Sequence, residues 1–189
     1  MKILSFLCRS DVFQAQLEQI RPKLYRVALS WCHNAALADD LAQEALVKAL
    51  KNSAQLRDPA LLNGWLFSIL TNCWRDHFRR YREMDDIDDI EDIEDYRCAN
   101  ETTPEDEHAQ SQLVSRVRDA VAKLPLGQRQ VLTLVDLEEF SYIEVATILA
   151  IPIGTVMSRL CRARHALKTQ LEELAPQQLA QVSQIRRVI

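Results

Sequence analysis

Glycine and aromatic residues are scarce in this sequence. Glycine occurs three times in 189 residues, and aromatic residues make up 6% of the chain. The chain has no glycine-rich phosphate loop, no G-x-S-x-G nucleophile turn and no H-E-x-x-H metal motif. It also has no stretch in which apolar and polar residues alternate between turn signals, as they do in a half-buried strand. These absences argue against an enzyme and against a β-sheet, and we expect no catalytic residue, no cofactor and no bound metal.

Long apolar runs and a regular cysteine spacing are also missing. No run approaches the roughly 18 apolar residues of a membrane span. The apolar core of the opening segment MKILSFLC is shorter than the roughly seven residues of a secretion signal. The five cysteines, at positions 8, 32, 73, 98 and 161, are odd in number and have no disulfide-framework spacing. We therefore expect a cytoplasmic protein that makes no membrane contact of its own.

Strong helix formers dominate the composition instead. Ala, Leu, Glu, Gln and Arg are abundant, and 48% of the residues are apolar. A chain of this length forms either one large domain or two small ones. We expect an all-α protein with two small helical domains joined by a flexible linker.

Charge is distributed unevenly along the chain. The formal net charge is −4, but residues 1–83 have a balance of +4, residues 84–110 of −11 and residues 111–189 of +3. Overall acidity argues against a nucleic-acid partner, whereas the two basic segments favour one in two separate places. The acidic segment repels itself and favours an extended link.

Four parts follow from these patterns: a helical block at 11–83, an acidic linker at 84–110, a second helical block at 111–172 and a tail at 173–189. In the first block, apolar residues at helical spacing predict two amphipathic helices, a loop at 52–60 and a third helix at about 61–83. The buried faces of the first two helices are predicted at Leu17, Ile20, Leu24, Val27 and Ala28, and at Leu37, Leu41, Ala45 and Ala49.

The third predicted helix ends in a mixture of arginines and aromatic residues, RDHFRRYR at 75–82, next to Trp74. Flat rings stack on unpaired bases and guanidinium groups bind phosphates, so this mixture suits single-stranded nucleic acid. An aromatic core stripe with a solvated basic end explains the pattern about equally well.

The second block contains a helix, a tight turn and another helix between Ser141 and Leu171. Ser141 and Glu144 have capping-box spacing, with a buried stripe predicted at Ile143, Ala146 and Leu149. Pro152 suits the entrance of the second helix. The apolar face of that helix is predicted at Val156, Leu160, Ala163, Leu167 and Leu171.

The opposite face of this second helix carries arginine and lysine and no acidic residue. In a helix-turn-helix, the second helix enters the major groove, where polar side chains reach base edges and flanking cations neutralise phosphates. A helical hairpin with a solvated basic face is the alternative. The capping box, the proline entry and the acid-free face together favour DNA binding.

Two segments carry weaker signals. Isoleucines at 87, 90 and 93 stand three apart within the acidic linker, which suggests a short amphipathic turn that lies over a basic face when DNA is absent. Neutralising the acids at 85–95 would then strengthen DNA binding. In the tail, Leu179, Val182 and Ile185 suit either a small docking helix or a frayed end.

Taken together, the two blocks resemble a sigma-70 family member of group 4, the extracytoplasmic function (ECF) sigma factors, which keep only conserved regions 2 and 4. The resemblance covers about residues 14–172. It rests on DDLAQEALVKAL at 39–50, GWLFSILTNCWRDHFRR at 64–80, LPLGQRQVLTLVDLEEFSYIEVA at 124–146 and IPIGTVMSRLCRAR at 151–164.

The resemblance implies an initiation factor that binds core RNA polymerase, reads a minus-35 duplex and helps to melt a minus-10 element. An anti-sigma protein usually restrains such factors. The implied polymerase-binding residues are Asp39, Asp40, Gln43, Glu44 and Lys48. The implied minus-10 residues are Gln55, Leu56, Arg57, Asn72, Arg75, Arg79 and Arg80, with Trp65 packed below them.

In the second block the resemblance implies that Thr155, Met157, Ser158, Cys161 and Arg162 face the minus-35 element. Arg159, Arg164 and Lys168 are implied phosphate contacts. The sequence departs from the family pattern at Cys161, at Ala150, where glycine is frequent, and at Thr71, where a basic residue is common. These departures concern the promoter sequence rather than the class.

Two other functions are considered. Cys73 with His77, and Cys161 with His165, are each four residues apart and could together ligate zinc, which would make the chain a metal- or redox-sensing helix-turn-helix regulator. The pairs lack a C-x-x-C knuckle, and they lie where nucleic acid is expected. A duplex-binding regulator that never contacts polymerase would explain the second block alone and leave the first block without a role.

Overall fold

The structure is a computed structural model that describes residues 2–56, 58–84 and 109–172, and the elements in these ranges are helices or helical turns. In chain order they are α1 (Lys2–Cys32), α2 (Ala35–Lys51), η1 (Ser53–Gln55), η2 (Pro59–Leu61), α3 (Leu62–Met84), α4 (Ala109–Ala122), α5 (Leu126–Leu132), η3 (Thr133–Leu137), α6 (Tyr142–Leu149) and α7 (Ile153–Glu172). The predicted all-α class is therefore confirmed. Arg57 and the segments predicted to form the linker turn and the tail helix lie outside the described residues.

The first block consists of α1, α2 and α3, with α2 packed against both of its neighbours. The turn from α1 to α2 uses His33 in the left-handed region, at φ 52°, and Asn34 caps α2 by accepting a hydrogen bond of 3.0 Å from the backbone N–H of Leu37. The predicted apolar faces form the core of this block, where Leu24 and Leu41 are almost completely buried.

The second block consists of α4 to α7, and α7 packs against α4, α5 and α6. The predicted capping box is present at the start of α6. Ser141 N–H donates to Glu144 Oε2 over 2.8 Å, and Ser141 Oγ accepts from the backbone N–H of Glu144 over 3.3 Å. Hydrogen bonds to Ser141 lower the pKa of the Glu144 carboxyl. The turn to α7 places Ala150 in the left-handed region at φ 50°, and Pro152 directly precedes α7 as predicted.

The predicted buried stripe of α6 is wrong at one position. Ile143 is 70% exposed, whereas Val145, Ile148 and Leu149 are buried. Because α6 is apolar around most of its circumference, spacing alone could not tell which side faces the core. The inward side is fixed by packing against α3 and α7.

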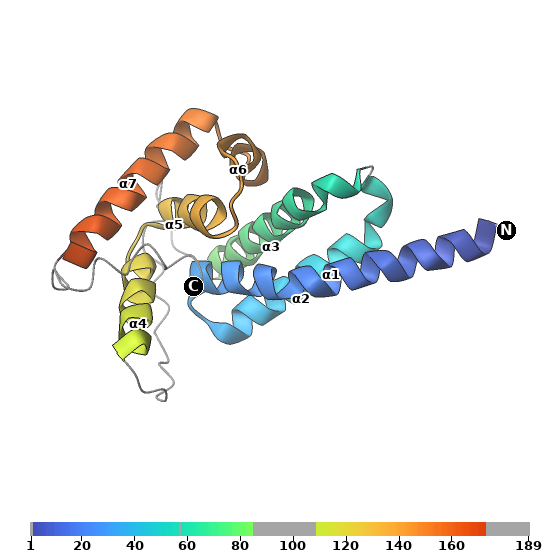
Figure 1. Cartoon of the computed structure of the whole chain (residues 1–189), viewed down its shortest axis with the longest axis horizontal. Helices are drawn as coiled ribbons and strands as arrows, with labels where there is room; N and C mark the ends of the chain where they lie inside the picture. The colour runs from blue at the N-terminus through green and yellow to red at the C-terminus, as the bar shows by residue number, and fades with distance from the viewer. Residues whose placement is uncertain (1, 57, 85–108, 173–189) are drawn as a thin grey trace.

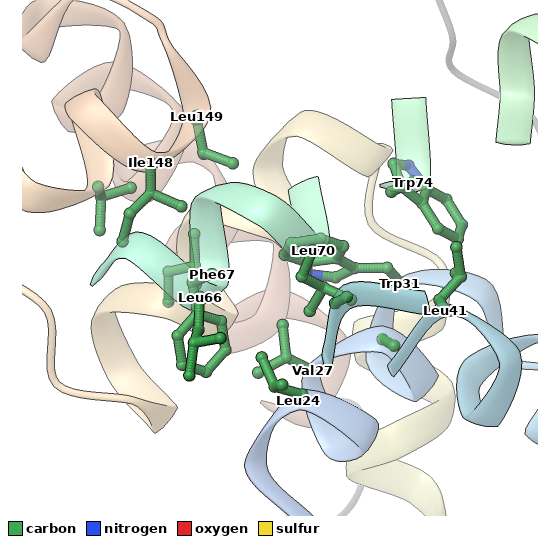
Figure 2. Close-up of a cluster of buried hydrophobic side chains, with 14 of the residues drawn as sticks. Leu24, Val27, Trp31, Leu41, Leu66, Phe67, Leu70, Trp74, Ile148 and Leu149 are labelled. Atoms are coloured by element: carbon green, nitrogen blue, oxygen red, sulfur yellow. The ribbon is translucent and has the colours of Figure 1, made fainter. Parts of the chain in front are cut away.

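The two blocks pack against each other and share one hydrophobic core (Figure 1). Figure 2 shows Ile148 and Leu149 of α6 beside Leu66 and Phe67 of α3. The ring of Phe67 also meets the ring of Phe140, edge to face, with centroids 5.2 Å apart. Such aromatic pairs contribute about 0.5–1.5 kcal/mol beyond their burial. The interface is thus a packed core and not a surface contact.

Polar contacts cross the same interface. Trp31 Nε1 donates to Thr133 Oγ1 over 2.8 Å, and Arg129 Nη1 donates to the backbone oxygen of Trp31 over 2.7 Å. Arg129 also donates to the backbone oxygens of Ala122 and Leu124, so this buried guanidinium holds the end of α4 as well as the other block. Such charge-assisted bonds are about twice as strong as neutral ones. Arg129 therefore fixes the second block onto the end of α1.

Two titratable groups lie at this interface. Burial, with Arg129 nearby, lowers the pKa of His33 to about 4. The Glu138 side chain is 6% exposed and lies 3.7 Å from Arg26 of α1. Burial raises the pKa of Glu138, and the charges of Lys23 and Arg26 oppose that effect.

No helix in the described ranges is by itself long and apolar enough to cross a membrane. The pair α6 and α7 passes that test of length and composition only when taken together, across a bend of 105°.

Candidate nucleic-acid interface

The second helix of the helix-turn-helix, α7, has one buried and one exposed side. Val156, Leu160 and Ala163 are buried, as predicted, and Leu167 and Leu171 are half-buried. The predicted minus-35 residues fall mostly on the exposed side. Exposed among them are Met157, Ser158, Cys161, Arg162, Arg164 and Lys168, whereas Thr155 and Arg159 are half-buried.

The arginines of α7 differ in what they contact. Among the described residues, Arg162 bonds within its own helix, to the backbone oxygen of Ser158 at 3.3 Å and to its hydroxyl at 3.4 Å. Arg164 makes a two-pronged contact with Asp136, at 2.6 Å and 3.2 Å. Arg162 thus extends from the exposed side of α7, while Arg164 is oriented by a carboxylate of η3.

Arg159 lies across α5 and depends on a glycine there. A Cβ atom at Gly127 would stand 2.8 Å from Arg159 Nη1 and 2.9 Å from its guanidinium carbon. A larger residue at position 127 would force this side chain to move. Gly127 and Asp136 both lie against basic residues of α7, and neither is among the residues predicted from the sequence.

His165, which the sequence suggested only as a zinc ligand, and Thr169 also lie on this exposed side of α7. Both are exposed, and residues 158, 162, 165 and 169 follow the three- and four-residue steps that mark one face of a helix. The same spacing that identified the buried stripe could have identified these two residues.

The predicted minus-10 residues of α3 lie on its surface. Asn72, Arg75, Arg79 and Arg80 are exposed, and Arg79 lies 3.4 Å from Asp76 on the same helix. Arg75 reaches the other block, where its Nη2 donates to the backbone oxygen of Leu149 at the end of α6. These four residues therefore lie on one helix, and one of them, Arg75, is hydrogen-bonded to the other block.

Two of the aromatic residues near these arginines, Trp74 and Phe78, pack in or against the core. Trp74 is 3% exposed, meets Trp31 edge to face at 6.1 Å and lies 4.3 Å from the ring of Phe78. The prediction that this mixture provides stacking platforms is therefore wrong for Trp74, which is buried beneath the arginines. For Trp74 and Phe78 the structure agrees with the alternative, an aromatic core stripe.

The loop between α2 and α3 consists of η1 and η2. Gln55 is exposed and Leu56 is half-buried against the core, while Arg57 lies outside the described residues. Asp58 caps η2 by accepting a hydrogen bond of 2.9 Å from the backbone N–H of Ala60. Trp65 is half-buried and packs against the core, which agrees with its predicted supporting position.

The predicted polymerase-binding residues share the outer side of α2. Asp40 and Gln43 are exposed. Asp39 accepts hydrogen bonds from Arg21 at 3.0 Å and from Gln43 at 2.6 Å. This side of α2 is polar and mostly exposed.

Lys48 connects this side of α2 to α3. It lies 2.9 Å from Glu44 and 3.4 Å from Asp76, and its hydrogen bond to Glu44 raises its pKa. Burial and the nearby Glu44 raise the pKa of the Cys73 thiol. Lys48 is therefore already engaged with two carboxylates.

The zinc hypothesis finds no support in this geometry. Cys73 is fully buried, whereas Cys161 is exposed on α7. Within residues 2–56, 58–84 and 109–172, no three or more His, Cys, Asp and Glu side chains are grouped so that they could hold a metal ion.

Comparison with known families gives two matches in chain order. Residues 17–83 match the model of Sigma-70 region 2, and residues 115–167 match that of Sigma-70, region 4. The ECF RNA polymerase sigma factor SigW of Bacillus subtilis is 31% identical over 170 residues, covering 87% of this chain and 91% of that protein. The ECF RNA polymerase sigma factor EcfG of Rhodopseudomonas palustris is 36% identical over 151 residues, covering 79% and 80%.

Solved structures show the same arrangement of helices. The sigma factor RpoE from Bartonella quintana, crystallised with the anti-sigma factor NepR, aligns with a TM-score of 0.66 and 27% identity, over 85% of this chain and 96% of that one. CnrH, in complex with the cytosolic domain of CnrY, shares the fold, with a TM-score of 0.60 and 24% identity over 86% and 89%. The chain belongs to the sigma-70 family, within its group of ECF RNA polymerase sigma factors.

Proposed function

We propose that this sigma factor docks on core RNA polymerase through α2, reads a minus-35 duplex with α7, and contacts the melted minus-10 strand with the α2–α3 loop and α3. The observation that carries this proposal is the exposed side of α7, which has no acidic residue between positions 153 and 171. A buried apolar stripe lies on the opposite side, and the preceding helix α6 begins with a capping box. An exposed helix face of this kind fits the major groove.

For the minus-35 element, we propose that the central exposed residues read base edges and the flanking cations bind phosphates. Arg162 suits a bidentate contact to guanine, because it is exposed on α7 and its guanidinium bonds to Ser158 of the same helix. Arg164 suits a phosphate contact whose direction Asp136 fixes. The proposed base-facing residues are Thr155, Met157, Ser158, Cys161 and Arg162, and the proposed phosphate contacts are Arg159, Arg164 and Lys168.

For the minus-10 element, we propose that Gln55, Leu56 and Arg57, together with Asn72, receive a base that leaves the stack. Extruding a base costs a few kcal/mol, which a shaped pocket must offset. Arg75, Arg79 and Arg80 would hold the phosphates of the strand. The exposure of Asn72 and these arginines on one helix supports the assignment.

For polymerase binding, we propose that Asp40 and Gln43 are the central contacts, because both are exposed on α2. Asp39, Glu44 and Lys48 would contribute through ion pairs that also brace α2 against α1 and α3. Oriented charges of this kind steer association and fix register.

The remaining assignments are also proposals. The family matches support functional boundaries at 11–83, 84–110, 111–172 and 173–189. Because RpoE from Bartonella quintana is bound by an anti-sigma factor, we propose that a protein of that kind restrains this chain. The factor would act in the cytoplasm as a regulatory subunit, with nucleotidyl transfer carried out by the polymerase.

In vitro transcription with bacterial core polymerase and a library of promoter sequences tests this function. We expect initiation only when the chain is added, from promoters that share an upstream and a downstream element. If the purified chain supports no initiation and does not bind core polymerase in a pull-down, the proposal fails.

A charge reversal separates the docking surface from the DNA-binding surfaces. Asp40→Lys is expected to weaken binding to core polymerase by tenfold or more, because it places a cation in an acidic contact surface. Glu18→Lys is the matched control, since Glu18 is also an exposed acid but lies on α1. If both variants lose polymerase binding equally, the docking surface is not on α2.

A further inference from the structure

One residue of α3 connects the two blocks at the point where each is expected to contact DNA. Arg75 donates from Nη2 to the backbone oxygen of Leu149, the last residue of α6. The final carbonyls of a helix lack partners within the helix, and a cation near them is favoured by the helix dipole. Arg75 thus caps α6 while it stands on the exposed side of α3.

The contact also places the two DNA-binding surfaces close together. Thr155 follows Leu149 by six residues, so the start of the α7 surface lies at most about 21 Å along the chain from the atom that Arg75 contacts. The two promoter elements are about 25 base pairs apart by their names, or ~85 Å of duplex at roughly 3.4 Å per base pair. Both surfaces therefore cannot engage one promoter while this contact is made.

The bond to Leu149 turns the Arg75 guanidinium towards α6, which packs on α3, and therefore away from a strand that would run along the exposed side of α3. The neighbouring Arg79 is not held in this way, because its ion pair is with Asp76 on its own helix. The second block is also held on α3 by the Phe67–Phe140 ring pair and by the buried side chains of Ile148 and Leu149.

We propose that Arg75 has two mutually exclusive partners: the carbonyl of Leu149 when the blocks are packed together, and the phosphate backbone of the melted strand when they separate. This inference rests on the proposed function, because the second partner is the minus-10 strand. The packed form thereby withholds one cation from DNA, and separation of the blocks supplies it.

A double-mutant cycle on the free, full-length chain tests the proposal. The probe is a fluorescent single-stranded 12-mer of mixed sequence, since phosphate contacts do not depend on sequence. Phe140→Ala loosens the packing without changing any proposed DNA contact. We expect it to tighten binding of the 12-mer about threefold or more, because a larger fraction of the chain is competent. The slope of log affinity against log salt should steepen by about 0.7, the value for one added single-strand phosphate contact.

The same Phe140→Ala change should have neither effect in a chain that also carries Arg75→Ala. In a chain that carries Arg79→Ala, which removes a neighbouring cation outside the interface, both effects should persist. Arg75→Ala alone should weaken binding or leave it unchanged. Three results would overturn the proposal. Arg75→Ala alone could bind the 12-mer more tightly, or Phe140→Ala could tighten binding even in a chain without Arg75. The third is that Phe140→Ala tightens binding in none of these chains.

Thr133→Val provides a second way to loosen the interface if Phe140→Ala fails to fold. It removes the acceptor of the Trp31 hydrogen bond, far along the chain from Arg75, and the same pattern is expected. Because the assay contains no polymerase or promoter, its outcome is separate from that of the transcription assay. A chain that directs transcription but shows no coupling would refute the role of Arg75 alone.

Discussion

The two surfaces assigned to DNA are built differently. On α7, the exposed side is complete within the second block: Arg159 lies over Gly127, Arg164 is oriented by Asp136, and Arg162 extends from the helix. On α3, by contrast, the aromatic residues beneath the arginines belong to the core, and Arg75 is bonded to the other block.

This difference indicates that duplex reading and strand binding have different requirements. The α7 surface is organised before it meets DNA, so it does not need a rearrangement of its own residues. In the proposed mechanism, the α3 surface is complete only when Arg75 leaves Leu149. Substitutions that loosen the contact between the two blocks therefore test this difference most directly.

The largest effect is expected from Arg129→Ala. Three carbonyls, of Trp31, Ala122 and Leu124, would lose a buried charged donor, and we expect the free energy of unfolding to fall by about 3–5 kcal/mol. Urea denaturation measures this loss. The exposed Arg118→Ala on α4 serves as the control and should change stability by less than about 0.5 kcal/mol. If Arg129→Ala lowers the free energy of unfolding as little as Arg118→Ala does, the packing of the two blocks does not depend on Arg129.

Arg162→Ala sharpens the comparison on the α7 side. We expect it to weaken binding of the minus-35 duplex by about 1–3 kcal/mol, the usual value of one bidentate base contact, while binding to core polymerase is unchanged. Fluorescence anisotropy on duplexes with and without the minus-35 element measures DNA binding. A pull-down with core polymerase measures polymerase binding. Equal loss of both activities would assign this helix another role.

Ala150→Gly tests whether the turn presets the direction of α7. Ala150 adopts φ 50°, a conformation that costs an L-residue about 1–2 kcal/mol and costs glycine little. Allowing for the greater entropy of glycine in the unfolded chain, we expect a gain of about 0.5–1 kcal/mol in thermal unfolding. Ala146→Gly, inside α6, should instead destabilise by about 1 kcal/mol. Destabilisation by both substitutions would show that the turn does not need a left-handed residue.

His33→Asn tests how the stability of the packed blocks depends on pH. The pKa of His33 is about 4 in the fold and 6.5 as the reference value, so the unfolded chain binds the proton first as the pH falls. Its contribution to stability is therefore complete above pH 6.5 and is lost as the pH falls towards 4. Asparagine tolerates the left-handed backbone but does not titrate there. Denaturation between pH 7 and 4 should show a shallower loss in the variant, and identical slopes would contradict the assignment.

Much of the fold could be predicted from local chemistry. The capping box at Ser141, the entry at Pro152 and the apolar spacing of α7 each specify a helix within a few residues of the chain. These signals are local, and the structure confirms them. The all-α class follows from the same kind of evidence.

The contacts between the blocks could not be predicted in this way. Ile143 and Val145 are both apolar, and only packing against α3 and α7 decides which one is buried. Arg75 and Trp74 likewise look like parts of one nucleic-acid motif, yet one bonds to Leu149 and the other is buried in the core. Sequence spacing describes one helix at a time, whereas these outcomes depend on contacts with other helices, such as that of Arg75 with Leu149, 74 positions along the chain.

Trp31 is a natural fluorophore at the contact between the two blocks. Its indole is 2% exposed, its Nε1 is bonded to Thr133, and its ring meets that of Trp74. Departure of the second block would leave the indole N–H to water and change the polarity around the ring. The emission wavelength of this natural fluorophore therefore reports, without any added label, whether the two halves of the chain are together or apart.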